Sequence, residues 1–171
     1  MAIRKVFTEG DPVLNKHARP VTTFDDRLRE LVEDMKETMV DDDGVGLAAP
    51  QVGVLRRIFV MDVDDGQGAR AFINPDIVAA DGEQCGPEGC LSLPGLYGIV
   101  KRPMRVTVRA QDVDGAPFEA TYEGLGARCI CHETDHLDGI LFRQHSEIPL
   151  CAFEDLPRFT GEAETEEGDP A

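Results

Sequence analysis

The sequence has little positive charge. Its 171 residues include 17 Lys and Arg against 33 Asp and Glu, which gives a formal net charge of −16. An electrostatic field of this sign repels nucleic acids and anionic membrane surfaces. We therefore expect a protein that binds neither nucleic acid nor membranes.

Long apolar runs and an export signal are also missing. No stretch approaches the roughly 20 apolar residues that a helix needs to span a bilayer. Residues 1–7 lack the apolar segment and small-residue cleavage site of a signal peptide, so we expect a cytoplasmic protein. The five cysteines are an odd number, which favours reduced thiols over a disulfide framework.

The length fits one domain, because a typical domain has about 150 residues. We expect this single domain to cover residues 1–160. Residues 161–171 hold five acidic residues and no large apolar one. A segment of this composition cannot bury enough apolar surface to fold, so we expect a disordered acidic tail.

Two helical patterns flank a region that resembles strands. Residues 22–40 place apolar side chains at helical intervals, with Thr22 or Thr23 as the N-cap, and residues 124–138 predict a second helix. Between them, the strand-like segments are residues 57–63, 71–74, 104–113 and 118–122, the last two joined as a hairpin. This order of elements predicts an α+β fold rather than a βαβ repeat.

The second helix contains the pattern His-Glu-x-x-His at residues 132–136. At about 100° per residue, His132 and His136 lie about 40° apart on one face, so both imidazoles can bind one metal ion. Glu133 lies about 100° from His132, where it can act as a general base toward water on the metal. The alternative is a pair of surface histidines, but the metal site accounts for every residue of the pattern.

A catalytic site of this kind needs a third protein ligand. Cys131 points about 140° away from His136, and Cys129 lies about 10.5 Å from His136 along the axis, so neither thiol can join. Cys129 fits better in a pocket beside the metal, together with Leu125. The remaining candidates are Cys90, in a glycine-flanked loop, and His145, Glu147, Glu154 and Asp155. Spacing favours Cys90 only slightly over Glu147 or Glu154.

Three segments, taken in order, resemble the three motifs of the peptide deformylases. Residues 44–51 read GVGLAAPQ, residues 88–92 read EGCLS and residues 132–137 read HETDHL. The resemblance extends over nearly all of residues 3–146. It implies mixed or antiparallel β-sheets packed around a C-terminal helix that carries the HExxH pattern, with an N-terminal amphipathic helix. It also implies a metal-dependent hydrolase that removes the N-formyl group from the initiator methionine of new polypeptides and releases formate.

The resemblance further assigns roles to residues. It makes Cys90, His132 and His136 the metal ligands and Glu133 the acid–base residue. Fe²⁺ is the usual metal of the family, although Zn²⁺, Ni²⁺ and Co²⁺ can share this ligand set. The resemblance assigns stabilisation of the oxyanion to Gln51 and to the Leu91 backbone N–H. It assigns binding of the peptide backbone to Gly46 and a pocket for the methionine side chain to Val45, Leu125 and Cys129. It also implies that Arg102 lies near the site, among the substrate-binding residues. Without the resemblance, Gln51, Leu91 and Val45 would pass for ordinary loop or core residues.

The chain departs from the family pattern in two places. Cys131 stands where many members have Gln, but it lies off the metal-binding face. Some members carry a basic C-terminal helix that docks on the ribosome, whereas Pro149, Pro157 and the acidic tail argue against one here. We therefore expect formylmethionyl nascent chains as partners, with at most transient ribosome contact. Cys85 and Cys151 are expected to be buried as small hydrophobic residues.

Two other functions fit parts of the sequence. A zinc endopeptidase shares the HExxH pattern, but its usual downstream ligand pattern is missing and the Cys90 segment would be unexplained. A non-catalytic metal-binding module would instead have a closed site, with Cys129 or Glu133 as a fourth protein ligand.

Overall fold

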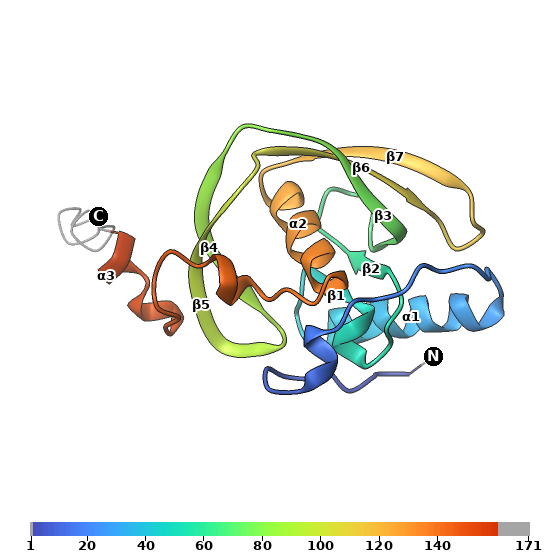
Figure 1. Cartoon of the computed structure of the whole chain (residues 1–171), viewed down its shortest axis with the longest axis horizontal. Coiled ribbons are helices and arrows are strands. Elements are labelled where there is room, and N and C mark those ends of the chain that lie inside the picture. Colours follow the sequence, from blue (N-terminus) through green and yellow to red (C-terminus); the bar gives the residue numbers. More distant parts are fainter. Residues whose placement is uncertain (1, 161–171) are drawn as a thin grey trace.

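The structure is a computed structural model that describes residues 2–160 (Figure 1). The strands are β1 (Gly46–Ala48), β2 (Ile58–Met61), β3 (Arg70–Asp81), β4 (Gln84–Cys90), β5 (Leu93–Arg102), β6 (Arg105–Gln111) and β7 (Pro117–Glu123). The α-helices are α1 (Asp26–Asp41), α2 (Leu125–Leu137) and the short α3 (Pro157–Thr160), and the 3₁₀ turns are η1 (Pro12–Asn15), η2 (Ala49–Val52), η3 (Phe142–His145) and η4 (Phe153–Asp155). The acidic tail expected at residues 161–171 lies outside the described residues.

The strands form two antiparallel sheets. Five of them are ordered β1-β2-β3-β6-β7, and the hairpin β4-β5 forms a separate two-stranded sheet. Helix α2 lies between the hairpin and the larger sheet (Figure 1), with contacts to β1, β2, β5, β6 and β7. The α+β prediction, with sheets packed around the helix that carries HExxH, is confirmed. No helix within residues 2–160 combines the length and apolar character needed to cross a membrane.

Helix α1 is amphipathic, as predicted, but it begins later than the sequence indicated. Its buried face is apolar and includes Leu28, Val32, Met35 and Met39. The N-cap is Asp25, whose side chain accepts a hydrogen bond from the Leu28 backbone N–H at 3.1 Å, so the prediction of Thr22 or Thr23 is wrong. Asp caps a helix at least as well as Thr. Phe24, just before the cap, packs against the core below the helix.

Strand β3 continues to Asp81, beyond the end predicted at Asn74. Asn74 has a left-handed φ of 51° and precedes a proline, which is a pattern typical of a turn. The pairing with β6 instead shifts register between Ile73 and Asp76, and the strand continues past this irregularity. A β-bulge therefore accommodates the residues that the sequence indicated as a break.

Three expectations for the cysteines are also wrong. Cys90 is the last residue of β4, not part of a loop, because the β4-β5 pairing continues through a register shift at Gly89. Cys85 is exposed and Cys151 is half-buried. The Cys85 side chain lies on the two-stranded hairpin, which leaves much of its surface open, and its Sγ donates to a Glu147 carboxylate oxygen at 3.5 Å.

Asn74 connects the segment before α1 to the larger sheet. Its side chain accepts from the Val21 backbone N–H at 2.8 Å and donates to the Val21 carbonyl at 2.9 Å and to Gln111 Oε1 at 2.8 Å. We expect Asn74→Ala to lower the free energy of unfolding by about 3 kcal/mol, at about 1 kcal/mol per hydrogen bond. Urea denaturation would measure the change.

The control is Asp64→Ala. Asp64 has a similar φ of 58° but lies exposed in a loop, so this variant reports the backbone cost of Ala alone. Equal losses of stability in the two variants would show that the hydrogen bonds of Asn74 contribute little.

Candidate metal centre

Three side chains from two elements converge on one point. Cys90 ends β4, and His132 and His136 lie one turn apart on α2. Their ligand atoms all lie within 4.8 Å of one another, and Cys90 Sγ is 3.3 Å from His136 Nε2. Within residues 2–160, neither Cys129 nor Glu133 belongs to this group, which argues against a closed site with four protein ligands.

The chemistry of the three groups fits a divalent transition metal. A thiolate with two imidazoles is a donor set suited to iron or zinc. Burial and the neighbouring His132 keep the pKa of His136 well below its usual value, so His136 is in the neutral form that binds metals. Its buried Nδ1 has no hydrogen-bond partner among the described residues.

The approach of Cys90 depends on a glycine. Gly89 lies directly against the ring of Tyr97 across the hairpin, and a Cβ at this position would lie 2.5 Å from Tyr97 Cε2. Any larger residue would have to displace the Tyr97 ring, directly before Cys90. The glycine in the EGCLS segment therefore lets this ring pack against β4 next to the candidate ligand.

His132 is oriented by a buried carboxylate. Glu88 on β4 is 6% exposed, and its Oε2 lies 2.6 Å from His132 Nδ1. Burial opposes ionisation, but hydrogen bonds and positive charge from His132 and Arg102 hold the pKa of Glu88 well below its usual value. An ionised carboxylate can only accept, so Nδ1 donates and Nε2 is left to face the metal.

Glu133 lies beside the ligand group. The side chain is buried, and its Oε2 is 4.0 Å from His132 Nε2. Its Oε1 has no hydrogen-bond partner among the described residues, and burial raises the pKa of Glu133 to about 7. Gly46 packs against it so closely that a Cβ there would lie 2.5 Å from Oε2. This carboxyl group can take up or release a proton near neutral pH.

A cavity of about 500 Å³ opens over these groups. Its lining includes all the residues predicted for the site except His136 and Arg102, namely Val45, Gly46, Gln51, Cys90, Leu91, Leu125, Cys129, His132 and Glu133. Val45 and Leu125 are 45% and 53% exposed, while Cys129 is buried. The cavity therefore has apolar walls and a polar floor that includes the candidate ligands Cys90 and His132.

The Gln51 amide faces this floor. Its Nε2 lies 3.6 Å from Cys90 Sγ and donates to Ser92 Oγ at 3.0 Å. Its Oε1 accepts from the Ala48 backbone N–H at 2.9 Å. These contacts fix the orientation of the amide, so its N–H₂ group lies next to the metal ligand.

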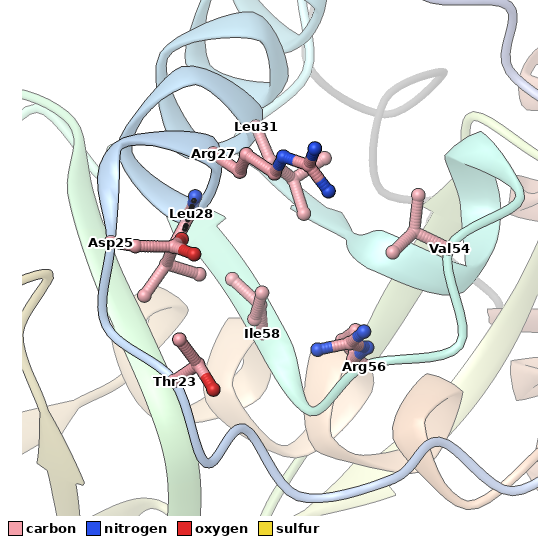
Figure 2. Close-up of a pocket in the computed structure, with 8 residues that line it drawn as sticks. All are labelled: Thr23, Asp25, Arg27, Leu28, Leu31, Val54, Arg56 and Ile58. Carbon is pink, nitrogen blue, oxygen red and sulfur yellow. Dashed lines mark hydrogen bonds between the residues drawn. The ribbon is translucent and has the colours of Figure 1, made fainter.

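A second cavity, of about 300 Å³, lies at the start of α1 (Figure 2). Arg27 and Arg56 flank it, above a floor that includes Leu28 and Ile58. The carboxylate of Asp25 is engaged as the helix cap. Its eight lining residues include no Cys or His, whereas two of the three candidate metal ligands, Cys90 and His132, line the first cavity.

The structure also brings in residues to which the sequence had assigned no role. Glu88 and Arg128 form ion pairs behind His132, and the Ser92 hydroxyl meets the Gln51 amide. Arg102, expected near the substrate, is buried and hydrogen-bonded to Glu88 and Asp135.

One sequence signal could have pointed to Arg128. It precedes His132 by one helical turn, so the two side chains lie on the same face of the helix.

A cysteine and two histidines with converging ligand atoms, beside a buried carboxyl group and under an open cavity, form the arrangement of a metal-dependent hydrolase.

Comparison with known proteins assigns this hydrolase to a family. The polypeptide deformylase family matches residues 3–148. The peptide deformylase of Caldanaerobacter subterraneus subsp. tengcongensis is 56% identical over 142 residues, which is 83% of this chain and 88% of that protein. Peptide deformylase 1 of Clostridium perfringens is 52% identical over 145 residues, 85% of this chain and 99% of that protein.

Solved structures agree. The crystal structure of the peptide deformylase from Thermotoga maritima superposes with a TM-score of 0.82 at 45% identity, covering 85% of this chain and 99% of that one. The crystal structure of a peptide deformylase from Legionella pneumophila superposes with a TM-score of 0.82 at 44% identity. The match covers 96% of this chain and 94% of that one. The chain belongs to the polypeptide deformylase family. It is a metal-dependent enzyme that removes the N-formyl group from new polypeptides.

The Glu88 carboxylate predicts a stability effect. We expect Glu88→Ala to destabilise the metal-free protein by about 3–5 kcal/mol, because it leaves two buried guanidinium groups without their shared acceptor. The pKa of Glu88 is lowered in the folded protein. Its contribution to the free energy of unfolding is therefore fully present above the usual pKa of 4.5, and it is lost as the pH falls through the lower pKa of the folded state. Urea unfolding at neutral and acid pH would measure both effects.

The control is Glu119→Ala, which breaks an exposed pair with Arg109 on the large sheet. Exposed pairs contribute less than about 1 kcal/mol. A Glu88 variant no less stable than this control would contradict the role of the buried carboxylate.

Proposed function

We propose that Cys90, His132 and His136 hold a catalytic Fe²⁺ and that Glu133 carries the proton during hydrolysis of the N-formyl amide of formylmethionyl polypeptides. The observation that carries this proposal is the convergence of the three ligand atoms beside the buried Glu133 carboxyl group, whose Oε1 has no hydrogen-bond partner among the described residues. A divalent cation held there would lower the pKa of water and polarise the formyl carbonyl.

Glu133 would serve both proton transfers. With a pKa of about 7, it can accept a proton from the attacking water and later donate it to the departing amine of the methionine. A group whose pKa lies near the working pH is efficient in both directions. The free Oε1 leaves room for this exchange.

The oxygen of the formyl group gains negative charge as water adds to the carbon. We propose that the Gln51 Nε2 amide and the Leu91 backbone N–H donate to it. The support is that Ala48 and Ser92 hold the Gln51 amide in place before the substrate arrives. Donors oriented in advance stabilise such charge most effectively.

The substrate peptide would lie along β1. This strand is the edge of the five-stranded sheet, so its free side at Gly46 can pair with an extended peptide backbone. Val45, Leu125 and Cys129 would enclose the methionine side chain. We propose that Arg102 supports the site through Glu88, since its guanidinium group is engaged with carboxylates behind the cavity.

We also propose that residues 1–160 act as one catalytic domain in the cytoplasm, where formylated chains emerge during synthesis. After α2, residues 138–160 form only short turns and the four-residue α3. We therefore favour encounter with nascent chains by diffusion, with at most transient ribosome contact.

Variants of two site residues test the proposed roles. We expect Glu133→Ala to retain its metal but to lose about 10²- to 10⁴-fold in kcat, because only the proton carrier is removed. We expect Cys90→Ser to lose metal, since a hydroxyl is a poor substitute for a thiolate. The assay is formate release from formyl-Met-Ala-Ser by anaerobically prepared protein, with metal content measured in parallel.

Cys85→Ser is the matched control, because this exposed thiol precedes Cys90 on the same strand and lies outside the ligand group. It should retain both metal and activity. Full activity of Glu133→Ala would sink the proposed mechanism.

The identity of the metal has a separate test. A ferrous ion with a thiolate ligand should react with oxygen, so we expect the Fe²⁺-loaded enzyme to lose activity in air while the Ni²⁺-loaded enzyme keeps it. Formate release would be followed over time with and without oxygen. An enzyme that is active only with Zn²⁺ would rule out iron as the native metal.

A further inference from the structure

Arg128 is a charged side chain buried on α2, one turn before His132. It is only 7% exposed. Its Nη1 donates to Glu88 Oε1 on β4 at 2.8 Å, and its Nη2 donates to the Val100 carbonyl on β5 at 3.0 Å. One guanidinium group therefore ties α2 to both strands of the hairpin.

Arg102 makes the complementary connection from β5. Its Nε and Nη2 donate to the two oxygens of Glu88 at 3.1 and 2.7 Å, and its Nη1 donates to Asp135 Oδ2 on α2 at 2.8 Å. The two guanidinium groups thus hold Glu88 from different directions. Two arginines facing two carboxylates also balance in charge, which reduces the cost of burying them.

The metal ligands need such a connection because they belong to separate parts of the fold. Cys90 lies on the β4-β5 hairpin, which is not hydrogen-bonded into the five-stranded sheet, while both histidines lie on α2. The distance between thiol and imidazoles therefore depends on how firmly the hairpin is held against the helix. A displacement of about 1 Å is enough to spoil a metal site.

We propose that Arg128 is a positioning residue: by bonding Glu88 and Val100, it holds the β4-β5 hairpin against α2 so that Cys90 stays within ligand distance of His132 and His136. The inference rests on the proposed ligand set but not on the proposed reaction. Arg128 also borders the cavity, yet both of its terminal nitrogens are bonded to protein acceptors. Its orientation is thus set by the protein and not by a ligand.

The test is metal binding by Arg128→Met, which keeps an unbranched side chain but removes both hydrogen bonds. We expect affinity for Co²⁺ and Ni²⁺, measured on the full chain by competition with a chelator, to fall about 10- to 100-fold, as for other residues that orient metal ligands. The thiolate-to-Co²⁺ absorption band should weaken at limiting metal. Formate release should recover at saturating metal, because Arg128 is not placed among the reacting groups.

Two further variants make the result interpretable. Arg109→Met removes an exposed guanidinium group on the large sheet and should leave the affinity unchanged. Arg128→Lys keeps the charge and one nitrogen donor, so it should recover part of the affinity. If Arg128→Met does not fold, Arg128→Lys still tests the proposal, because its affinity should fall below that of the wild type.

Two outcomes would overturn the proposal. One is a folded Arg128→Met variant with wild-type metal affinity and an unchanged thiolate band, which would limit Arg128 to a packing role. The other is a wild-type protein that binds Co²⁺ without any thiolate band. That result would overturn the ligand set as well, so failure of the ligand set and failure of the positioning role are distinguishable.

Discussion

The site depends on the burial of one negative charge. An isolated carboxylate at the position of Glu88 would cost several kcal/mol to remove from water. It is stable there because Arg102, Arg128 and His132 all donate to it. Satisfying this charge draws β4, β5 and α2 together, and the same contacts that hold the elements in place also orient His132, a candidate metal ligand. Fold stability and the geometry of the candidate metal site therefore share one interaction.

The parts of the site that were predictable from sequence are those set by local geometry. The placement of His132 and His136 on one helical face follows from the helical repeat alone, and α2 has the expected extent. Cys90 was different, because its approach requires the pairing of β4 with β5 and a register shift at Gly89. Spacing gave it little advantage over Glu147, and only the resemblance of the EGCLS segment to a family motif singled it out.

The connections behind the metal ligands were not predictable for a related reason. Glu88 and Arg128 are 40 residues apart, and charged residues are usually exposed, so nothing local indicates that they are buried together. The cysteines also show that residue type alone does not predict burial.

Cys85 and Cys131 have the same side chain, yet Cys85 is exposed on the hairpin while Cys131 is buried on α2. Whether a small apolar side chain is buried depends on where its strand or helix lies in the fold.

Glu88 and Glu133 show how the environment separates two identical groups into different roles. Both are buried and both lie next to His132. For Glu88, hydrogen bonds and positive charge from His132 and Arg102 outweigh burial, so its pKa is lowered and it keeps its charge at neutral pH. For Glu133, burial is the dominant influence, so its pKa rises to about 7. A permanently ionised carboxylate can orient a histidine but cannot exchange protons, whereas one that titrates near neutrality can. The groups that donate to Glu88 thus keep that carboxylate ionised, and the absence of such donors around Glu133 Oε1 within residues 2–160 supports its proposed role as the proton carrier.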